Sequence, residues 1–221
     1  MNPEMQSQKP DYSIFNSNEL SRKVIHFSIC VSTFFFSHYL SWWQGTLIGM
    51  LCLLLVFYAD KNGWITYLKN VKRKSTGEYW MILGILLVFL MFKIVWQENS
   101  QFADISYFTA LFSLGVADPL SMFGRPIFNY LQTIPTLKRI TSKLTLGGKT
   151  FTGTLIYIIS SFLIGALAIW LYDPSIISNY RYWLLISYII LVGGVEFVSI
   201  WGLDNIFIPV LSFIFMYLTL V

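Results

Sequence analysis

The chain has 221 residues, of which 56% are hydrophobic and only 12% are charged, and its formal net charge is +4. With a mean hydropathy of +0.62, this composition excludes an ordinary soluble domain and is typical of an integral membrane protein. The two cysteines, Cys30 and Cys52, lie inside apolar runs, so we expect small buried hydrophobic residues rather than a disulfide or a metal pair.

Apolar runs recur along the chain at about the ~20 residues needed to cross a ~30 Å hydrocarbon core. Residues 1–22, which come before the first of these runs, are polar and contain Glu4, Asp11 and Glu19, so we expect no cleavable signal peptide. The sequence predicts an all-α, polytopic membrane protein with one domain, residues 1–221. We expect seven spans, with six or eight as alternatives: 24–40, 44–59, 79–96, 105–123, 153–171, 182–197 and 203–220.

Basic residues are distributed unevenly between the two faces that seven spans would create. Only Arg181 clearly belongs to one face, and Lys93 lies within a span. The positive-inside rule therefore makes the other face cytoplasmic, with the N-terminus and the loops 60–78 and 124–152. Orientation and attraction to anionic membrane lipids explain this charge without a nucleic-acid partner. The thirteen basic residues on the cytoplasmic face are Lys9, Arg22, Lys23, Lys61, Lys69, Lys72, Arg73, Lys74, Arg125, Lys138, Arg139, Lys143 and Lys149.

Polar residues at the starts of two spans allow two interpretations each. Arg22 and His26 are four residues apart, so a helix places both on one face. They form a candidate site, whereas a basic flank that anchors the helix is the alternative and is favoured for Lys23. Glu78, after Gly77, begins the third span, where a carboxylate could either belong to a site or stabilise the positive end of the helix dipole. Segment 64–74 suits a short interfacial helix with a basic end.

Three carboxylates are predicted at the same membrane boundary. Asp118 lies inside an apolar run next to Pro119, and an ionisable group at such a depth is a functional candidate by default. Glu196 ends the sixth span, and Asp204 with Asn205 begins the seventh. Carboxylates can bind Mg²⁺ through few ligands while phosphates supply the rest. One of them could also accept a proton from an attacking alcohol.

The segment Gly147-Gly148-Lys149-Thr150 is similar to part of a P-loop, but position 143 is Lys where that motif requires Gly. The region that follows is also a membrane helix. A glycine turn with a lysine and the hydroxyls of Thr150 and Thr154 at a helix N-terminus can still bind phosphate. We therefore expect a phosphate site here without a P-loop fold.

Five short sequence blocks, in the order in which they occur along the chain, resemble the polytopic polyprenol kinase family. This family includes dolichol kinase, phytol kinase and CTP-dependent diacylglycerol kinases. The resemblance covers about residues 19–209, and the third and fourth blocks are the specific ones. Thr152 stands where the family usually has Glu, and Phe128 where it usually has Gly. The blocks are RKxxH at 22–26, GE at 77–78, ADPLSMFGR at 117–125, GGKTFTGT at 147–154, and VE with LDNIFIP at 195–196 and 203–209.

The resemblance implies transfer of a phosphoryl group from CTP, or another pyrimidine nucleotide, to a lipid alcohol in the membrane. Asp118 and Glu196 would bind Mg²⁺, with Asp204 as a further ligand or base and Lys149 as a catalytic cation. The remaining site residues would include Glu78, Pro119 and Asn205. The nucleotide would be bound by Arg22, Lys23, His26, Gly124, Arg125, Gly147, Gly148, Lys149, Thr150 and Gly153.

Two other functions stay open at this point. A CDP-lipid synthase would use the same nucleotide, but its long acidic signature is not found in this sequence. A lipid or solute transporter could couple ions through Asp118 and Glu196, although the paired half-repeats typical of such proteins are not visible. Release of CDP would indicate the kinase, release of pyrophosphate the synthase, and neither product the transporter.

Overall fold

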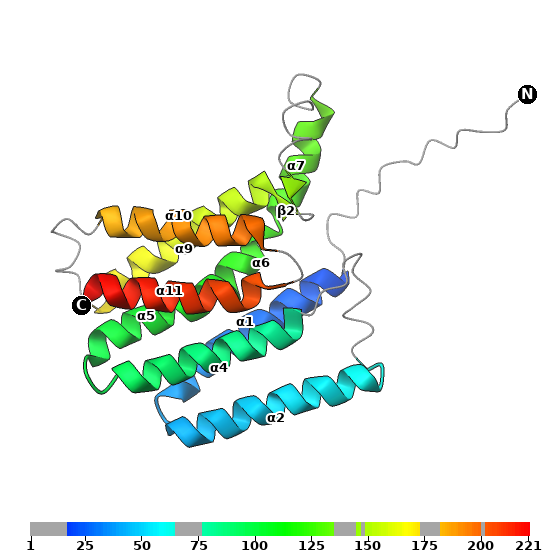
Figure 1. Ribbon diagram of the computed structural model, residues 1–221. Coiled ribbons are helices and arrows are strands. Elements are labelled where there is room, and N and C mark those ends of the chain that lie inside the picture. Colours follow the sequence, from blue (N-terminus) through cyan, green and yellow to red (C-terminus); the bar gives the residue numbers. More distant parts are fainter. Residues whose placement is uncertain (1–16, 65–76, 135–144, 147–148, 173–181, 200–201) are drawn as a thin grey trace, which may run out of the picture.

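The computed structural model describes residues 17–64, 77–134, 145–146, 149–172, 182–199 and 202–221. These residues fold into an almost entirely helical bundle whose long helices pack beside one another, as Figure 1 shows. The helices are α1 (Ser17–Ser37), α2 (Trp42–Lys61), α4 (Gly77–Val95), α5 (Ser100–Phe112), the π-helix η1 (Ser113–Ala117), α6 (Asp118–Ser121), α7 (Gly124–Thr133), α9 (Phe151–Tyr172), α10 (Tyr182–Val198) and α11 (Asp204–Leu220).

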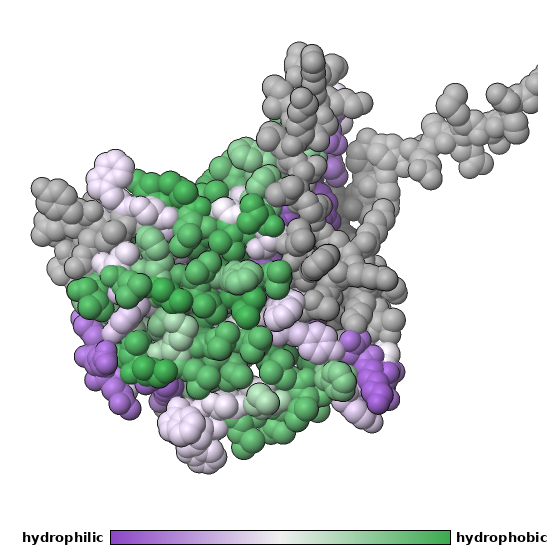
Figure 2. Space-filling view, viewed as in Figure 1, coloured by the Kyte–Doolittle hydropathy of each residue, from purple (hydrophilic) through white to green (hydrophobic). Residues whose placement is uncertain are grey.

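Three of the described helices, α2, α4 and α9, are long and apolar enough to cross a membrane. Two shorter apolar helices, 185–198 and 204–220, lie in the regions of the last two predicted spans. Figure 2 shows a broad apolar face, with hydrophilic side chains gathered toward its two ends. These features indicate a membrane protein. A helical segment is found in each of the seven predicted regions, while a seven-span topology stays a prediction.

The centre of the bundle is α5, which is buried along most of its length and contacts α1, α4, α9 and α11. One hydrophobic cluster joins α5 with α9, α10 and α11, and a second joins it with α1, α4 and α11. Stacked aromatic rings strengthen the second cluster, where Phe92 and Tyr107 lie 4.3 Å apart between ring centroids. Because α5 is held on all sides, the segment that continues from it has a fixed position.

The predicted span 105–123 is a continuous path of three helical pieces, α5, η1 and α6. The amide of Asp118 donates to the carbonyl of Ser113, five residues earlier, as a π-helix requires. Pro119 follows at the first turn of α6, where a residue without an amide hydrogen is tolerated. The π-helix therefore changes the helical register immediately before Asp118, and such bulges are frequent at functional sites.

A close approach between α1 and η1 fixes the first helix against this segment. A Cβ atom on Gly115 would lie 2.6 Å from the Cβ of Cys30, so only glycine permits this contact without a shift. Small residues let helix backbones approach closely in membrane proteins. The approach brings the N-terminal half of α1 beside α6.

Two short strands precede α9, and the sequence did not predict them. β1 (Thr145–Leu146) and β2 (Lys149–Thr150) pair antiparallel, with Thr145 opposite Thr150 and Leu146 opposite Lys149. Antiparallel strands separated by two residues have the register of a two-residue hairpin. Residues 147 and 148 themselves lie outside the described residues, as does most of the predicted interfacial helix 64–74.

Candidate functional site

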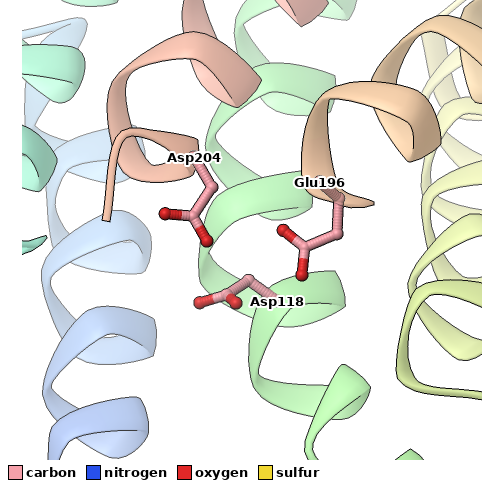
Figure 3. Close-up of side chains that lie close together, drawn as sticks. All are labelled: Asp118, Glu196 and Asp204. Carbon is pink, nitrogen blue, oxygen red and sulfur yellow. The ribbon is translucent and has the colours of Figure 1, made fainter. Parts of the chain in front are cut away.

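Three carboxylates from three different helices, two of them buried and one half-buried, meet at one end of the bundle. Asp118 begins α6, Glu196 lies near the end of α10, and Asp204 begins α11, as Figure 3 shows. Oxygen atoms of these three side chains all lie within 4.8 Å of one another. At an effective dielectric constant of about 20, each pair of charges at this distance repels by about 3 kcal/mol. The cluster therefore needs nearby positive charge.

Lys149 supplies positive charge to two of the three carboxylates. Its Nζ lies 2.6 Å from Oε2 of Glu196 and 2.6 Å from Oδ2 of Asp204. Burial alone would lower the pKa of Lys149, but the two carboxylates outweigh this effect and raise the pKa above its ordinary value. Lys149 therefore stays protonated at neutral pH.

Lys23 and His26 of α1 reach the third carboxylate. The ammonium of Lys23 contacts Oδ2 of Asp118 in a buried ion pair. His26 is also buried, and its Nδ1 lies 3.8 Å from the same oxygen, which is too far for a hydrogen bond. Neither ring nitrogen of His26 has a hydrogen-bond partner among the described residues. A buried polar group without a protein partner needs an explanation, and a water, an ion or a ligand can supply one.

The N-terminus of α9 is fitted tightly against the start of α7. A Cβ on Gly124 would lie 2.2 Å from the backbone nitrogen of Gly153, so the two backbones are in direct contact. The Thr150 hydroxyl accepts a hydrogen bond from the amide of Gly153 at 3.2 Å, which caps the first turn of α9. Thr152 donates to the carbonyl of Gly124 at 2.7 Å. These contacts hold Lys149 at the carboxylates.

A cavity of about 80 Å³ opens among these groups. Four basic and four acidic side chains line it, so its charges balance when all are ionised. The Thr154 hydroxyl also faces this cavity, is buried, and has no partner among the described residues. The lining residues are Glu19, Arg22, Lys23, Asp118, Ser121, Met122, Arg125, Lys149, Thr150, Gly153, Thr154, Glu196 and Asp204.

Arg22 of α1 and Arg125 of α7 both line the cavity. Arg125, from the first turn of α7, donates to Glu19 of α1 at 3.0 Å, and about half of its side chain is exposed. The pair therefore bridges α1 and α7 at the rim of the cavity. The Arg125 side of this ion pair is open to solvent, and such pairs contribute little stability.

Of the remaining predicted residues, Asn205, Glu78 and Pro119 are described and are not part of the lining of the cavity. Asn205 donates through Nδ2 to the carbonyl of Gly77 at 3.0 Å, which ties the start of α11 to the start of α4. Glu78 follows in the first turn of α4 and is 9% exposed. Its Oε2 has no partner among the described residues. Pro119 sets the start of α6, and Gly147 and Gly148 lie outside the described residues.

The structure also adds residues that the sequence did not single out. Ser121 and Met122 line the cavity. The Ser121 hydroxyl donates to the carbonyl of Asp118 at 2.7 Å and holds the turn that bears the carboxylate. Ser121 could have been predicted from the sequence, because it is three residues after Asp118 on a helix and therefore on the same face. Met122 carries no polar group that would have identified it.

The three carboxylates fit a divalent cation. Oxygen ligands of a six-coordinate Mg²⁺ lie at 2.0–2.1 Å from the ion, which places them about 3 to 4 Å from one another. The observed limit of 4.8 Å between the ligand atoms requires a contraction of only about 1 Å. All three donors are hard oxygens, the type that Mg²⁺ prefers.

Comparison of the chain with protein-family models, with curated proteins and with solved structures gives no match.

Proposed function

We propose that this protein is a membrane kinase that transfers the γ-phosphoryl group of CTP, or of another pyrimidine nucleotide, to the hydroxyl of a lipid alcohol. The observation that carries the proposal is the convergence of Asp118, Glu196 and Asp204 with Lys149 in a polar cavity at the end of an apolar bundle. Carboxylates that can hold a metal, set beside lysines and arginines, suit the charge pattern of a metal-bound nucleotide.

The balanced lining of the cavity supports phosphoryl transfer in particular. A divalent cation held in this cavity would supply positive charge that offsets the charge developing during phosphoryl transfer. Asp118 and Glu196, with Asp204, are the residues that would hold it. Lys149, Arg22 and Arg125 would then bind phosphate oxygens. The cavity of about 80 Å³ has room for an ion and a few water-sized groups, so the nucleoside would lie beyond its rim.

The reaction forms a bond between the lipid oxygen and the γ-phosphorus and breaks the bond between that phosphorus and the β–γ bridging oxygen. CDP leaves, and the hydroxyl proton passes to a carboxylate of the site, for which Glu196 and Asp204 are the candidates. The buried positions of these groups exclude bulk water, which would otherwise compete with the alcohol. The preference for CTP rests on the resemblance of the sequence blocks to the polyprenol kinases.

The membrane arrangement belongs to the same proposal. Seven spans would place the cavity, the N-terminus and the loops 60–78 and 124–152 on the cytoplasmic side, where nucleotides are available. The positive-inside rule supports this orientation. A lipid alcohol could then keep its chain in the hydrocarbon region while its hydroxyl reaches the ends of α6, α10 and α11.

The direct test is product analysis with the purified protein. CTP, UTP and ATP would each be combined with a prenol, with phytol and with diacylglycerol in the presence of Mg²⁺. We expect a phosphorylated lipid and a nucleoside diphosphate from at least one pair. Pyrophosphate and a CDP-lipid formed from phosphatidate would instead identify a synthase. No phosphorylated lipid from any pair would refute the kinase.

A further inference from the structure

A second hollow of the molecule lies between α1, α2 and α4 and differs from the polar cavity in its chemistry. Its volume is about 560 Å³, within the range of sites that hold one small ligand. Its lining is apolar apart from a few hydroxyls and one thiol, and none of the side chains that line it is charged. α2 has no buried residue and rests on α4 where Gly45 faces Phe89 and Gly49 faces Leu86. The hollow is therefore a groove bounded by a peripheral helix.

On α1, the residues that line the groove continue a row that begins at the functional site. Successive members of this row are separated by three or four residues, so they lie on one face of the helix. Arg22 lines the polar cavity, and the members from Ile29 onward line the groove. Within α1 the row consists of Arg22, His26, Ile29, Thr33 and Phe36, and Leu40, which also lines the groove, follows the end of the helix.

A similar row on α4 leads from the groove to Glu78. Ile82, Ile85 and Phe89 line the groove, and Glu78 lies one turn before Ile82 on the same face. Glu78 is buried, and its Oε2 has no partner among the described residues. The Gly77–Asn205 hydrogen bond places this turn of α4 next to Asp204. The α1 row therefore has the polar residue His26, and the α4 row the polar residue Glu78, between the groove and the carboxylate cluster.

We propose that this groove binds the hydrocarbon chain of the lipid alcohol, with the hydroxyl at the end marked by Glu78 and His26. The inference rests on the kinase activity proposed above and adds the class of substrate, a single-chain alcohol of the prenol type. The unpartnered Glu78 oxygen would accept a hydrogen bond from the substrate hydroxyl before transfer. An unpaired acceptor at the head of an apolar groove matches a molecule with one hydroxyl and one long apolar chain.

The dimensions of the groove indicate the length of that chain. From Ile29 to Ser37, where α1 ends, the lining part of the helix extends for eight residues, or about 12 Å at 1.5 Å per residue. This length is less than half of the ~30 Å hydrocarbon core, so the helical part of the groove lies within the depth of one leaflet. A chain of about this length would lie in the groove entirely, whereas a much longer polyprenol would extend past Leu40 into the lipid.

Photo-crosslinking tests the location without a mutation. The wild-type protein in phosphatidylcholine vesicles would receive geranylgeraniol that carries a diazirine at the end of its chain. We expect crosslinks on the peptides of α1 and α4 that contain Phe36 and Phe89, and unlabelled geranylgeraniol should compete for them. Crosslinks on α9 or α10, or crosslinks that excess geranylgeraniol leaves unchanged because the groove holds bulk phospholipid only, would overturn the proposal.

A pair of variants on α1 tests the role of the groove in catalysis. Thr33→Phe places a ring in the groove, and Ser28→Phe adds the same ring at an exposed position outside it. Thr33→Phe should raise KM for geranylgeraniol about tenfold or more because of steric conflict. Its kcat/KM for prenol, a single isoprene unit, should stay within about twofold of wild type. Ser28→Phe should change neither value.

The outcomes separate this inference from the kinase proposal. If the wild type phosphorylates neither alcohol, the kinase proposal fails. If the wild type phosphorylates both alcohols and Thr33→Phe leaves KM for geranylgeraniol unchanged, the groove proposal fails while the kinase proposal stands. Diacylglycerol as a substrate better than geranylgeraniol would refute the single-chain class. Should Thr33→Phe not fold, the crosslinking result decides.

Discussion

Lys23 of α1 and Asp118 of α6 form a buried ion pair across 95 residues of sequence. Removal of either partner would leave an uncompensated buried charge, a situation that typically costs about 3–5 kcal/mol. The pair makes the first helix part of the site rather than a simple membrane anchor. It also links the position of Asp118 to the packing between α1 and η1, where Gly115 lies against Cys30.

Gly115→Ala should separate this ion pair. The added Cβ would lie 2.6 Å from the Cβ of Cys30, so α1 has to move away from η1. We expect a loss of stability of about 1–3 kcal/mol, typical of overpacking, and a lower kcat/KM, measured by thermal unfolding and by lipid phosphorylation. Cys30→Gly in the same chain should restore part of the activity because it removes the conflicting atom.

The matched control for this variant is Gly194→Ala on α10. A Cβ at Gly194 would meet no atom within 4 Å, although this residue is only two positions from Glu196. It should keep wild-type activity. Equal losses in both variants would show that any alanine in these helices is harmful and would refute the role assigned to the α1–η1 contact.

Lys149→Ala should weaken both nucleotide binding and the stabilisation of the transition state. Its ammonium lies between Glu196 and Asp204, so its loss leaves the buried Glu196 and the half-buried Asp204 without this counter-charge. We expect kcat/KM to fall by an amount equivalent to about 2–4 kcal/mol, as for the loss of one preorganised electrostatic group. Membrane insertion should not change, since this residue contributes no apolar burial.

The control is Lys93→Ala, because Lys93 lies near the far end of α4 with its ammonium 5.6 Å from the centre of the Phe92 ring. Its removal should leave phosphorylation intact. A Lys149→Ala protein with kcat/KM within about twofold of wild type would refute the electrostatic role.

Glu78→Gln separates a role in the site from a role in helix capping. The change keeps the shape of the side chain and removes its charge. If Glu78 accepts the substrate hydroxyl, turnover should fall strongly while insertion is unchanged. If it only interacts with the dipole of α4, the cost should be about 0.3–1 kcal/mol of stability with activity near wild type. Glu98→Gln, at an exposed position after α4, is the control.

Much of the helical framework could be predicted from the sequence, because apolar runs of membrane length report helices directly. The run at 153–171, for example, corresponds to α9 over 151–172. The convergence of Asp118, Glu196 and Asp204 was also expected, since each lies where an apolar run meets a polar segment. The seven predicted spans would place those three positions on one side of the membrane.

Other parts of the site depend on contacts that no local pattern encodes. Lys23 has the spacing of an ordinary basic flank, and only the packing of α1 on η1 turns it toward Asp118. The π-helix arises from a register change next to Pro119, whereas the hydrophobic pattern alone predicted one regular helix. The apolar groove was also invisible, because its lining residues resemble those of any membrane helix.

The measurement that tests the central claim most directly is lipid phosphorylation by Asp118→Asn. Asparagine keeps the volume and the hydrogen-bonding capacity of the side chain but removes the charge that Mg²⁺ requires. As a control, Asp104→Asn removes the carboxylate that pairs with His38 at 3.0 Å outside the site and should retain activity. We predict that Asp118→Asn inserts normally, transfers no phosphate and is not restored by excess Mg²⁺. Wild-type activity in Asp118→Asn would contradict the proposed site.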